Sequence, residues 1–254
     1  MMIDIVSVNN MRSSEKVMME HETSSIELMY RASLVLFKSY SWKGRIKIVV
    51  GKGNNGGDGY ALACFLAEKE LKPIIYKVED PASEESSYFA SKASSLGVLI
   101  KPYQSDKNLL EDSDIIVDCL LGTGFQGEVK ENYRKAIEEI NNKKDAYIIS
   151  CDINSGISGD YGPSSAFVKS DLTICIQAIK KGLLIQAKNH LKEIAVGDIG
   201  ISLLEEENHL LDEKENLSLD KNLLQENDFF YAENGSHKLY VVPKWLKVTT
   251  LSYK

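Results

Sequence analysis

Several features that mark other protein classes are missing from this chain of 254 residues. No segment approaches the ~20 consecutive apolar residues of a membrane span. The first residues do not form a signal peptide either, because Asp4, Asn9, Asn10 and Arg12 interrupt any apolar run. Lysine and arginine form no dense cluster and the net charge is −7, which argues against nucleic acid and membrane surfaces as partners. We therefore expect a cytoplasmic protein.

Cysteine and histidine are scarce. The four cysteines stand singly in apolar stretches without a CxxC pair, and the four histidines show no metal-binding spacing such as HExxH. A disulfide framework and a zinc site are therefore not expected, and the cysteines should be reduced and buried. The length fits one α/β domain with additions.

Strand and helix patterns alternate along most of the chain. Helical periodicity over residues 26–37 follows a capping signal at Ser24 and Ser25. The patterns then predict strands over residues 46–50, 73–78, 98–101, 114–120, 146–152, 171–177 and 193–199, and helices over 57–69, 83–95 and 130–142. Such an alternation predicts a three-layer αβα sandwich, with a Rossmann-like, mostly parallel sheet and extra N-terminal helices.

The glycine-rich segment 51–59 is the most informative part of the sequence. It joins a β-branched strand to an apolar helix, and it contains five glycines. Unpaired N–H groups at such a helix start form an anion site. The spacing of its first three glycines matches the dinucleotide fingerprint, which alone is a weak signal. Asn54, Asn55 and Asp58 make the segment more polar than a phosphate cradle requires, so we expect a further role for it.

Polar residues also follow two other predicted strands. Asp118 precedes the loop 122–128, and Asp152 precedes Ser155 in a tight turn. The carboxyl ends of parallel strands lie at one edge of a sheet, so these groups should converge on the glycine-rich segment. Asp152 is the natural acid/base candidate, although an Asx turn explains it about equally well. Asn55, Asp118 and Ser155 offer oxygen ligands for a hard cation, with backbone capping as the alternative.

Two further sites are open to a functional interpretation. Glu79 or Asp80 ends the strand after the glycine-rich segment, where a ribose-binding acid would lie in a dinucleotide site. Lys180 and Lys181 follow the strand 171–177 and could reach an anion, although a solvated loop is the simpler interpretation.

In this order, the motifs resemble the YjeF N-terminal domain family, the NAD(P)HX epimerases. The matching stretches are Met11 and Arg12, then residues 28–32, 53–59, 117–118, 122–124, 152–156, 171–173, Lys180 and 197–200. The resemblance covers roughly residues 8–201, and the Gly-Asn-Asn-Gly-Gly-Asp-Gly stretch is its most specific part. It implies an enzyme that interconverts the R and S epimers of hydrated NADH and NADPH.

The resemblance also implies roles for individual residues. Asp152 would be the catalytic acid/base, and Asn55, Asp118 and Ser155 would bind one potassium ion per subunit. The residues implied to contact the substrate are Asn54, Asn55, Gly56, Gly57, Asp58, Gly122, Thr123, Gly124, Phe125, Gln126, Gly127, Glu128, Asp152 and Lys180. The family tends to form homodimers, and the N-terminal helices would provide the contact.

The sequence departs from the family pattern at a few positions. Asn154 stands where relatives usually have proline, Lys181 also replaces a proline, and Ser33 replaces a glycine. Without the proline, we expect a looser turn around Asp152 and Ser155, and reduced activity.

The C-terminal part of the chain has a different character. The epimerase domain is predicted over residues 1–203, followed by a polar tail over 204–254. Residues 235–238 read Gly-Ser-His-Lys and resemble the start of the dehydratase domain that is fused to many bacterial relatives. We therefore expect a truncated or split bifunctional protein, with a loosely packed tail that holds a remnant of that domain.

Two other functional classes compete with the epimerase. A Rossmann oxidoreductase that uses intact NAD(P) is disfavoured because the segment from Tyr147 lacks the lysine of a catalytic Tyr-x-x-x-Lys pair. A non-catalytic nucleotide-binding or scaffold protein is disfavoured because Asp118, Asp152, Ser155 and Lys180 are all present.

Overall fold

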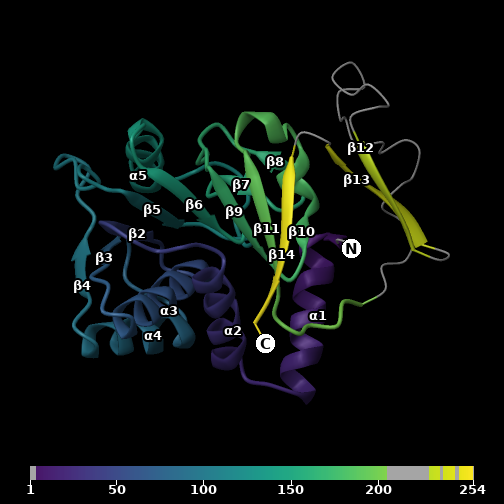
Figure 1. Ribbon diagram of the computed structural model, residues 1–254, viewed down its shortest axis with the longest axis horizontal. Coiled ribbons are helices and arrows are strands. Elements are labelled where there is room, and N and C mark those ends of the chain that lie inside the picture. Colours follow the sequence, from purple (N-terminus) through teal and green to yellow (C-terminus); the bar gives the residue numbers. More distant parts are fainter. Residues whose placement is uncertain (1–3, 205–228, 235–236, 244–245, 254) are drawn as a thin grey trace.

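An all-parallel sheet forms the centre of the molecule (Figure 1). The computed structural model describes residues 4–204, 229–234, 237–243 and 246–253. Within them, the main sheet has eight strands in the order β14-β11-β9-β6-β5-β2-β3-β4, and every neighbouring pair is parallel. The strands are β2 (Ile46–Val50), β3 (Ile74–Lys77), β4 (Leu99–Pro102), β5 (Ile115–Cys119), β6 (Tyr147–Cys151), β9 (Leu172–Ile176), β11 (Glu193–Asp198) and β14 (Lys247–Ser252).

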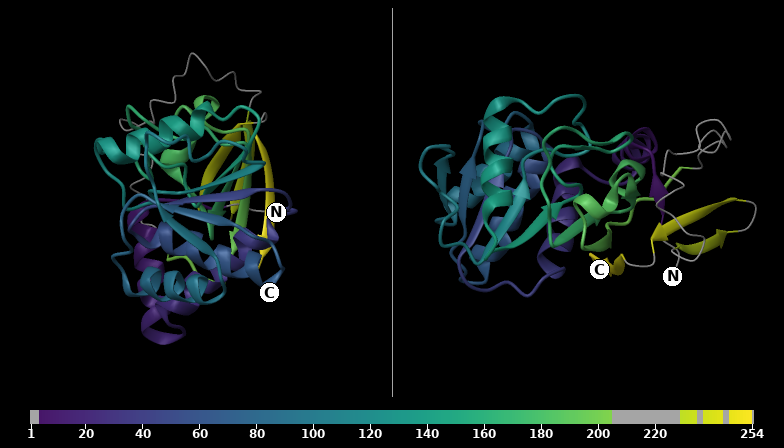
Figure 2. Two further views of the ribbon diagram at one scale, coloured as in Figure 1. Left: turned by 90° about the vertical axis from the view of Figure 1, so that its left-hand side faces the viewer. Right: turned by 90° about the horizontal axis from the view of Figure 1, so that it is seen from above.

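Helices cover both faces of this sheet, which confirms the predicted three-layer sandwich (Figure 2). The helices are α1 (Val8–His21), α2 (Ser25–Lys38), α3 (Asn54–Glu68), α4 (Glu84–Ser95) and α5 (Glu131–Asn142). Alternate residues of β2 show the two faces: Val50 packs in the core with α2, α3 and α4, whereas Val49 packs in the core with α5. This alternation follows from the two-residue period of a strand.

The predicted elements match the observed ones closely, with one instructive difference. Helix α3 begins at Asn54, three residues earlier than the expected start at residue 57. The glycines of segment 51–59 therefore lie partly inside a helix. A Cβ on Gly56 would come within 2.0 Å of the Gly51 carbonyl oxygen, and one on Gly57 within 2.5 Å of Met29. Close packing of α3 against its surroundings, more than loop flexibility, requires these glycines.

Several short elements were not predicted. They are β1 (Ile5–Val6), β7 (Ile157–Ser158), β8 (Gly162–Pro163), β10 (Ile179–Lys180) and the 3-10 turns η1 (Lys181–Leu184) and η2 (Ala187–Asn189). Strand β1 pairs with β10 in parallel, and the Ile179 N–H donates to the Asp4 carbonyl at 2.9 Å. The N-terminal segment is thereby fastened beside Lys180, which belongs to the candidate site.

The C-terminal residues contribute a strand to the main sheet. Strand β14 pairs with β11 along its whole length, and Leu246 is buried. The prediction of a loosely packed tail is therefore wrong for residues 246–253. The sequence alone did not reveal that β11 has a free edge with which these residues can pair. Strands β12 (Phe229–Asn234) and β13 (His237–Pro243) form a separate antiparallel pair. Residues 205–228 and 235–236 lie outside the described residues, and the division at residue 203 stays a prediction.

Two predictions about composition are tested directly. All four cysteines are buried and free, as expected. None of the helices among the described residues is long and apolar enough to cross a membrane.

Candidate functional site

A cavity of about 620 Å³ opens at the carboxyl ends of the central strands. Helix α3 follows β2, and the loop 120–128 follows β5; between these two adjacent strands the strand order reverses direction. Open parallel sheets bind their ligands at such a switch point. The predicted residues that line the cavity are Asn54, Asn55, Asp58, Gly122, Thr123, Gly124, Phe125, Gln126, Glu128, Asp152 and Lys180.

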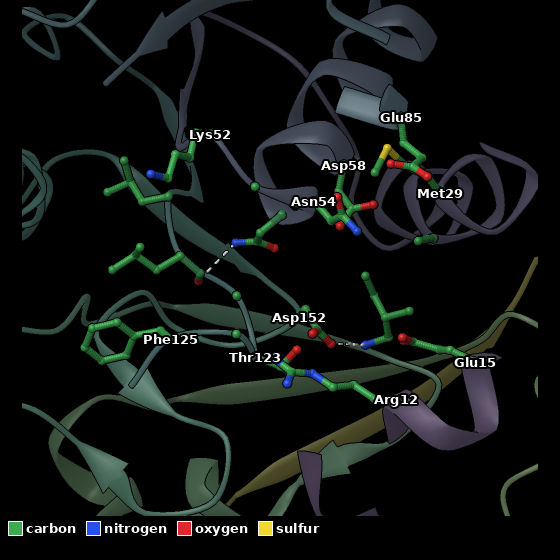
Figure 3. Close-up of a pocket in the computed structure, with 18 of the residues that line it drawn as sticks. Arg12, Glu15, Met29, Lys52, Asn54, Asp58, Glu85, Thr123, Phe125 and Asp152 are labelled. Carbon is green, nitrogen blue, oxygen red and sulfur yellow. Dashed lines mark hydrogen bonds between the residues drawn. The ribbon is translucent and has the colours of Figure 1, made fainter. Parts of the chain in front are cut away.

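Asp152 and Lys180 form an ion pair in the wall of this cavity (Figure 3). The Lys180 ammonium donates to Asp152 Oδ1 and to the Ile176 carbonyl, and Asp152 Oδ1 also accepts from the Ile176 N–H at 3.1 Å. The Lys180 side chain is 2% exposed and that of Asp152 is 14% exposed. Burial opposes the charge on Lys180, but Asp152, Cys175 and Glu15 together outweigh it and raise the pKa of Lys180. The pair therefore presents a carboxylate to the cavity with a fixed counter-ion behind it.

The backbone at Asp152 is unusual. Its φ angle of 62° lies in the left-handed region, which costs a non-glycine residue free energy and is held only where the surroundings enforce it. Here the Asp152 N–H donates to the Ile174 carbonyl at 2.7 Å. This conformation, adopted directly after β6, leaves the Asp152 side chain in the cavity wall with its carboxylate against Lys180.

A second polar group lies beneath the cavity, around the peptide of Leu121. Asp118 accepts from the Ser155 N–H and from Ser150 Oγ, both at 2.9 Å, and from Ser155 Oγ. The Leu121 N–H donates to Ser155 Oγ at 2.8 Å, and Asn55 Nδ2 donates to the Leu121 carbonyl at 3.1 Å. The structure therefore brings Asn55, Asp118 and Ser155 together, as the sequence predicted.

One oxygen in this group has no partner. Asn55 Oδ1 is buried and makes no hydrogen bond to any described residue. Burying an amide oxygen without a partner costs free energy, so its presence needs an explanation. Asp118 is fully buried, and this burial raises the pKa of its carboxyl in spite of the donors around it. No cluster of three or more His, Cys, Asp or Glu residues of metal-binding geometry occurs in the described ranges.

Asp58 adds a third acid to the site. It is buried, and Cys151 Sγ lies 3.9 Å from its Oδ2. Burial, together with repulsion from Asp152 and Glu15, raises the pKa of Asp58 well above its ordinary value. A neutral Asp58 carboxyl can donate a hydrogen bond to a ligand, which an ionised one cannot do.

The raised pKa of Asp58 predicts a pH-dependent stability. Because the folded state keeps the Asp58 proton to higher pH than the unfolded state does, this group lowers the free energy of unfolding as pH rises above the ordinary aspartate range. Asp58→Asn should therefore stabilise the fold near neutral pH, and the gain should vanish at acidic pH. Urea unfolding at several pH values measures this, with exposed Asp106→Asn as the control. An equal gain at every pH would contradict the explanation.

Comparison with known proteins places the chain in a family. A profile described as YjeF-related protein N-terminus matches residues 17–182. The chain belongs to this YjeF-related family. It is 31% identical to an NAD(P)H-hydrate epimerase of Elusimicrobium minutum over 78% of this chain and 91% of the relative. It is 36% identical to a Bifunctional NAD(P)H-hydrate repair enzyme Nnr of Coxiella burnetii, over 75% of this chain and 40% of the relative.

The YjeF-related chain spans about two fifths of the length of two bifunctional relatives that it matches. Its fold is also that of the crystal structure of yeast ynu0, with a TM-score of 0.67 and 18% identity over 82% of this chain and 98% of the yeast chain.

The YjeF-related site includes residues that sequence reasoning did not assign. Helix α1 brings Arg12 and Glu15 to the cavity. Lys52 also lines it and forms an ion pair of 3.3 Å with Glu79, which the sequence had offered as a possible ribose-binding acid. Arg12 and Glu15 stand three residues apart on one helix, a spacing that places both on one face. This spacing was readable in the sequence, but the cavity that the face lines was not.

Some predicted contacts lie elsewhere in the YjeF-related structure. Gly56 and Gly57 are buried in the packing of α3, and Asp118 and Ser155 are buried beneath the cavity. Gly127 has a φ of 78° in the loop after β5. Roles of these glycines in substrate binding stay predictions.

Asn154 does not loosen the turn as expected. The residue is fully buried, and its side chain replaces the rigidity of a proline by hydrogen bonds. Asn154 Nδ2 donates to the carbonyls of Val168 at 2.9 Å and His190 at 3.1 Å and to Ser170 Oγ at 2.9 Å, and Asn154 Oδ1 accepts from Thr173 Oγ1 at 2.7 Å. The turn that carries Asp152 and Ser155 is thus tied to β9 and to the loop before it.

Removal of this amide should cost stability. We expect Asn154→Ala to lower the free energy of unfolding by about 3 kcal/mol, because several buried polar groups lose their partner at once. Urea unfolding measures the loss. Asn189→Ala is the matched control, since Asn189 is exposed and its Nδ2 donates only to Gln186 at 3.3 Å. A cost as small as that of the control would contradict the role of Asn154.

Proposed function

We propose that this protein is an NAD(P)H-hydrate epimerase, which interconverts the R and S epimers of hydrated NADH and NADPH. The observation that carries the proposal is the Asp152–Lys180 pair in a cavity at the switch point of a parallel sheet. A relative that the chain covers almost completely is named NAD(P)H-hydrate epimerase. The volume of about 620 Å³ is that of a site for a ligand of cofactor size.

The chemistry requires proton transfer at C6 of the reduced nicotinamide ring. In one route, the C6 hydroxyl accepts a proton and leaves as water, while the ring nitrogen supplies the electron pair that forms a C6=N bond. Water then adds to the opposite face and gives up a proton. Asp152 is the proposed base for that proton. No oxidant is needed, since atoms and charge balance over the two steps.

The surroundings of Asp152 suit this role. Lys180 holds Asp152 Oδ1 from behind, so the carboxylate has a fixed orientation. The raised pKa of Lys180 keeps the counter-ion charged throughout the neutral range. We assign substrate contact to the residues that line the cavity near Asp152, including Asn54, Asp58 and the loop 122–128. The phosphates and the ribose of the substrate would lie against these residues.

A potassium ion fits the group around Leu121. Alkali cations prefer oxygen ligands and accept irregular geometry. Asn55 Oδ1 has no partner among the described residues. Ser155 Oγ contacts the Leu121 N–H and carbonyl, and Asp118 accepts from the Ser155 N–H. We propose that these oxygens hold the ion, which would connect the glycine-rich segment to the turn that carries Asp152 and would supply positive charge near the phosphates.

The protein is further proposed to act as a homodimer in the cytoplasm. Exposed apolar side chains of the N-terminal helices support a contact there: Val17 and Met19 on α1 and Tyr30 on α2 are each about two fifths exposed. Light scattering of the purified protein tests the dimer.

A single assay tests the activity against its alternatives. The protein is added to one purified epimer of NADHX, and the other epimer is followed by chromatography with potassium or sodium present. Conversion faster than the spontaneous rate supports the epimerase. Oxidation of NADH with a second substrate would instead support an oxidoreductase. Ligand binding without either reaction would support a non-catalytic protein.

A further inference from the structure

Helix α1 forms one wall of the cavity that contains Asp152. It begins at Val8, whose N–H donates to Asp160 Oδ1 at 3.0 Å, and Asn10 and Ser14 bond to the backbone of Leu204. Strand β1, directly before it, pairs with β10. The helix is therefore tied to both sides of the site and is a fixed part of it.

Glu15 is the acid that this wall presents. It lines the cavity together with Asp58, Asp152 and Lys180. Figure 3 shows the Glu15 side chain extending from α1 toward Asp152. Glu15 makes no hydrogen bond and no ion pair with any residue that the structure describes, whereas Asp152 is held by Lys180. Glu15 is thus available to a ligand.

Burial in the cavity wall favours a proton on Glu15. Burial is the largest influence, and it raises the pKa of Glu15. Lys180 lowers this pKa, Asp152 raises it, and Arg12 lowers it again. Asp58, on helix α3, is a further acid close to Glu15, and burial raises the pKa of Asp58. Two carboxyl groups with different environments thus face one space: Asp152, paired with a cation, and Glu15, unpaired and partly buried.

Such a difference between two acids separates their roles in proton transfer. We propose that Glu15 is a second catalytic residue, which donates the proton to the departing C6 hydroxyl while Asp152 receives the proton of the water that adds to the opposite face. The inference rests on the proposed epimerase function and deepens it. In the reverse direction the two groups exchange roles, and each turnover returns one proton to Glu15 and removes one from Asp152 through solvent.

The stereochemistry of the proposed reaction gives a reason for needing two proton-transfer groups. Epimerisation places the hydroxyl on opposite faces of the ring before and after the reaction. One carboxyl on one side of a fixed ring reaches only one face, so a second group on the other side must serve the other. Glu15 comes from α1 and Asp152 from the end of β6, which are different walls of the cavity.

The test compares Glu15→Gln with two other variants. Glu15→Gln keeps the size and hydrogen-bonding capacity but cannot deliver a proton, and we expect kcat to fall at least about 100-fold. Glu15→Asp keeps the acid and should retain more activity than the glutamine variant. Glu20→Gln is the matched control on the same helix, because Glu20 is exposed and only contacts Lys16; its kcat should equal that of the unaltered protein.

The pH profile provides a readout that a structural role would not change. An essential acid must be protonated, so kcat/KM of the unaltered enzyme should decline as pH rises through the raised pKa of Glu15. Glu15→Gln should lose that decline. Binding of the epimer mixture, measured by calorimetry, should change less than threefold.

The outcomes separate the two proposals. If the unaltered protein does not epimerise NADHX, the proposed function fails. If it does and Glu15→Gln keeps its kcat and pH profile, the epimerase stands and the role of Glu15 is wrong. A fall in kcat with an unchanged pH profile also overturns the role, because it assigns Glu15 to shaping the cavity alone.

Discussion

Asp152→Asn is expected to lower kcat of epimerisation about 1,000-fold, the range for loss of a general base. Asparagine has the size of aspartate but cannot take a proton at neutral pH. Asp152 contacts the cavity directly, so the loss falls on the chemical step, and KM should change much less. Steady-state kinetics with a single NADHX epimer measures both constants.

The same substitution has a second effect that must be separated from the first. It leaves the Lys180 ammonium, which is 2% exposed, without its counter-ion. Breaking a buried ion pair by removing one partner costs about 3 kcal/mol or more. Asp152→Asn should therefore also lower the free energy of unfolding. The double variant Asp152→Asn with Lys180→Met removes the unpaired charge and should recover stability.

The double variant distinguishes the explanations. Recovered stability with activity still absent assigns the loss to proton transfer by Asp152. Recovered activity would instead show that the single variant failed through its unpaired lysine. Full activity of Asp152→Asn itself would refute the assignment of the base.

The sequence predicted the fold better than it predicted the site. Apolar strands such as Ile46–Val50 are recognisable because burial on both faces leaves no polar position. Ser24 caps α2 as its position indicated. Strand β14 was missed because its residues alternate weakly and follow a long polar stretch, and only the open edge of β11 makes them a strand. Information of that kind is absent from local sequence.

The candidate site was predicted where it depends on strand ends. Parallel strands place Asn55, Asp118 and Asp152 at one edge, so their convergence followed from topology. Glu15 was missed, because α1 reaches the cavity through long-range contacts to Leu204 and Asp160. The partner of Asp152 was open to interpretation for a similar reason. Lys180 is 28 residues away in sequence, and only its burial shows that it is no surface lysine.

Asn154 shows how a local rule can mislead. The loss of a proline predicted a looser turn, because the rule concerns the backbone alone. The structure compensates with side-chain hydrogen bonds to residues up to 36 positions away. A substitution judged by its own position therefore gave the wrong direction.

Removal of the Asn55 side chain should weaken the response to potassium. Asn55→Ala deletes the one buried amide oxygen that has no partner among the described residues. If this oxygen is a ligand, the potassium concentration that gives half-maximal activity should rise at least about tenfold, the lower end of what is lost when a metal site is disturbed. Titration with potassium chloride at constant ionic strength measures it.

A second measurement does not depend on activity. A ligand that binds only the folded state raises the melting temperature with its concentration. Potassium should therefore stabilise the unaltered protein more than sodium does, and Asn55→Ala should lose that difference. Asn54→Ala is the matched control: Asn54 is the neighbouring amide and lines the same cavity, so its loss should raise KM for the epimer without changing the response to potassium. Equal responses of Asn55→Ala and the unaltered protein would show that the oxygen serves the substrate and leave the ion without its proposed ligand.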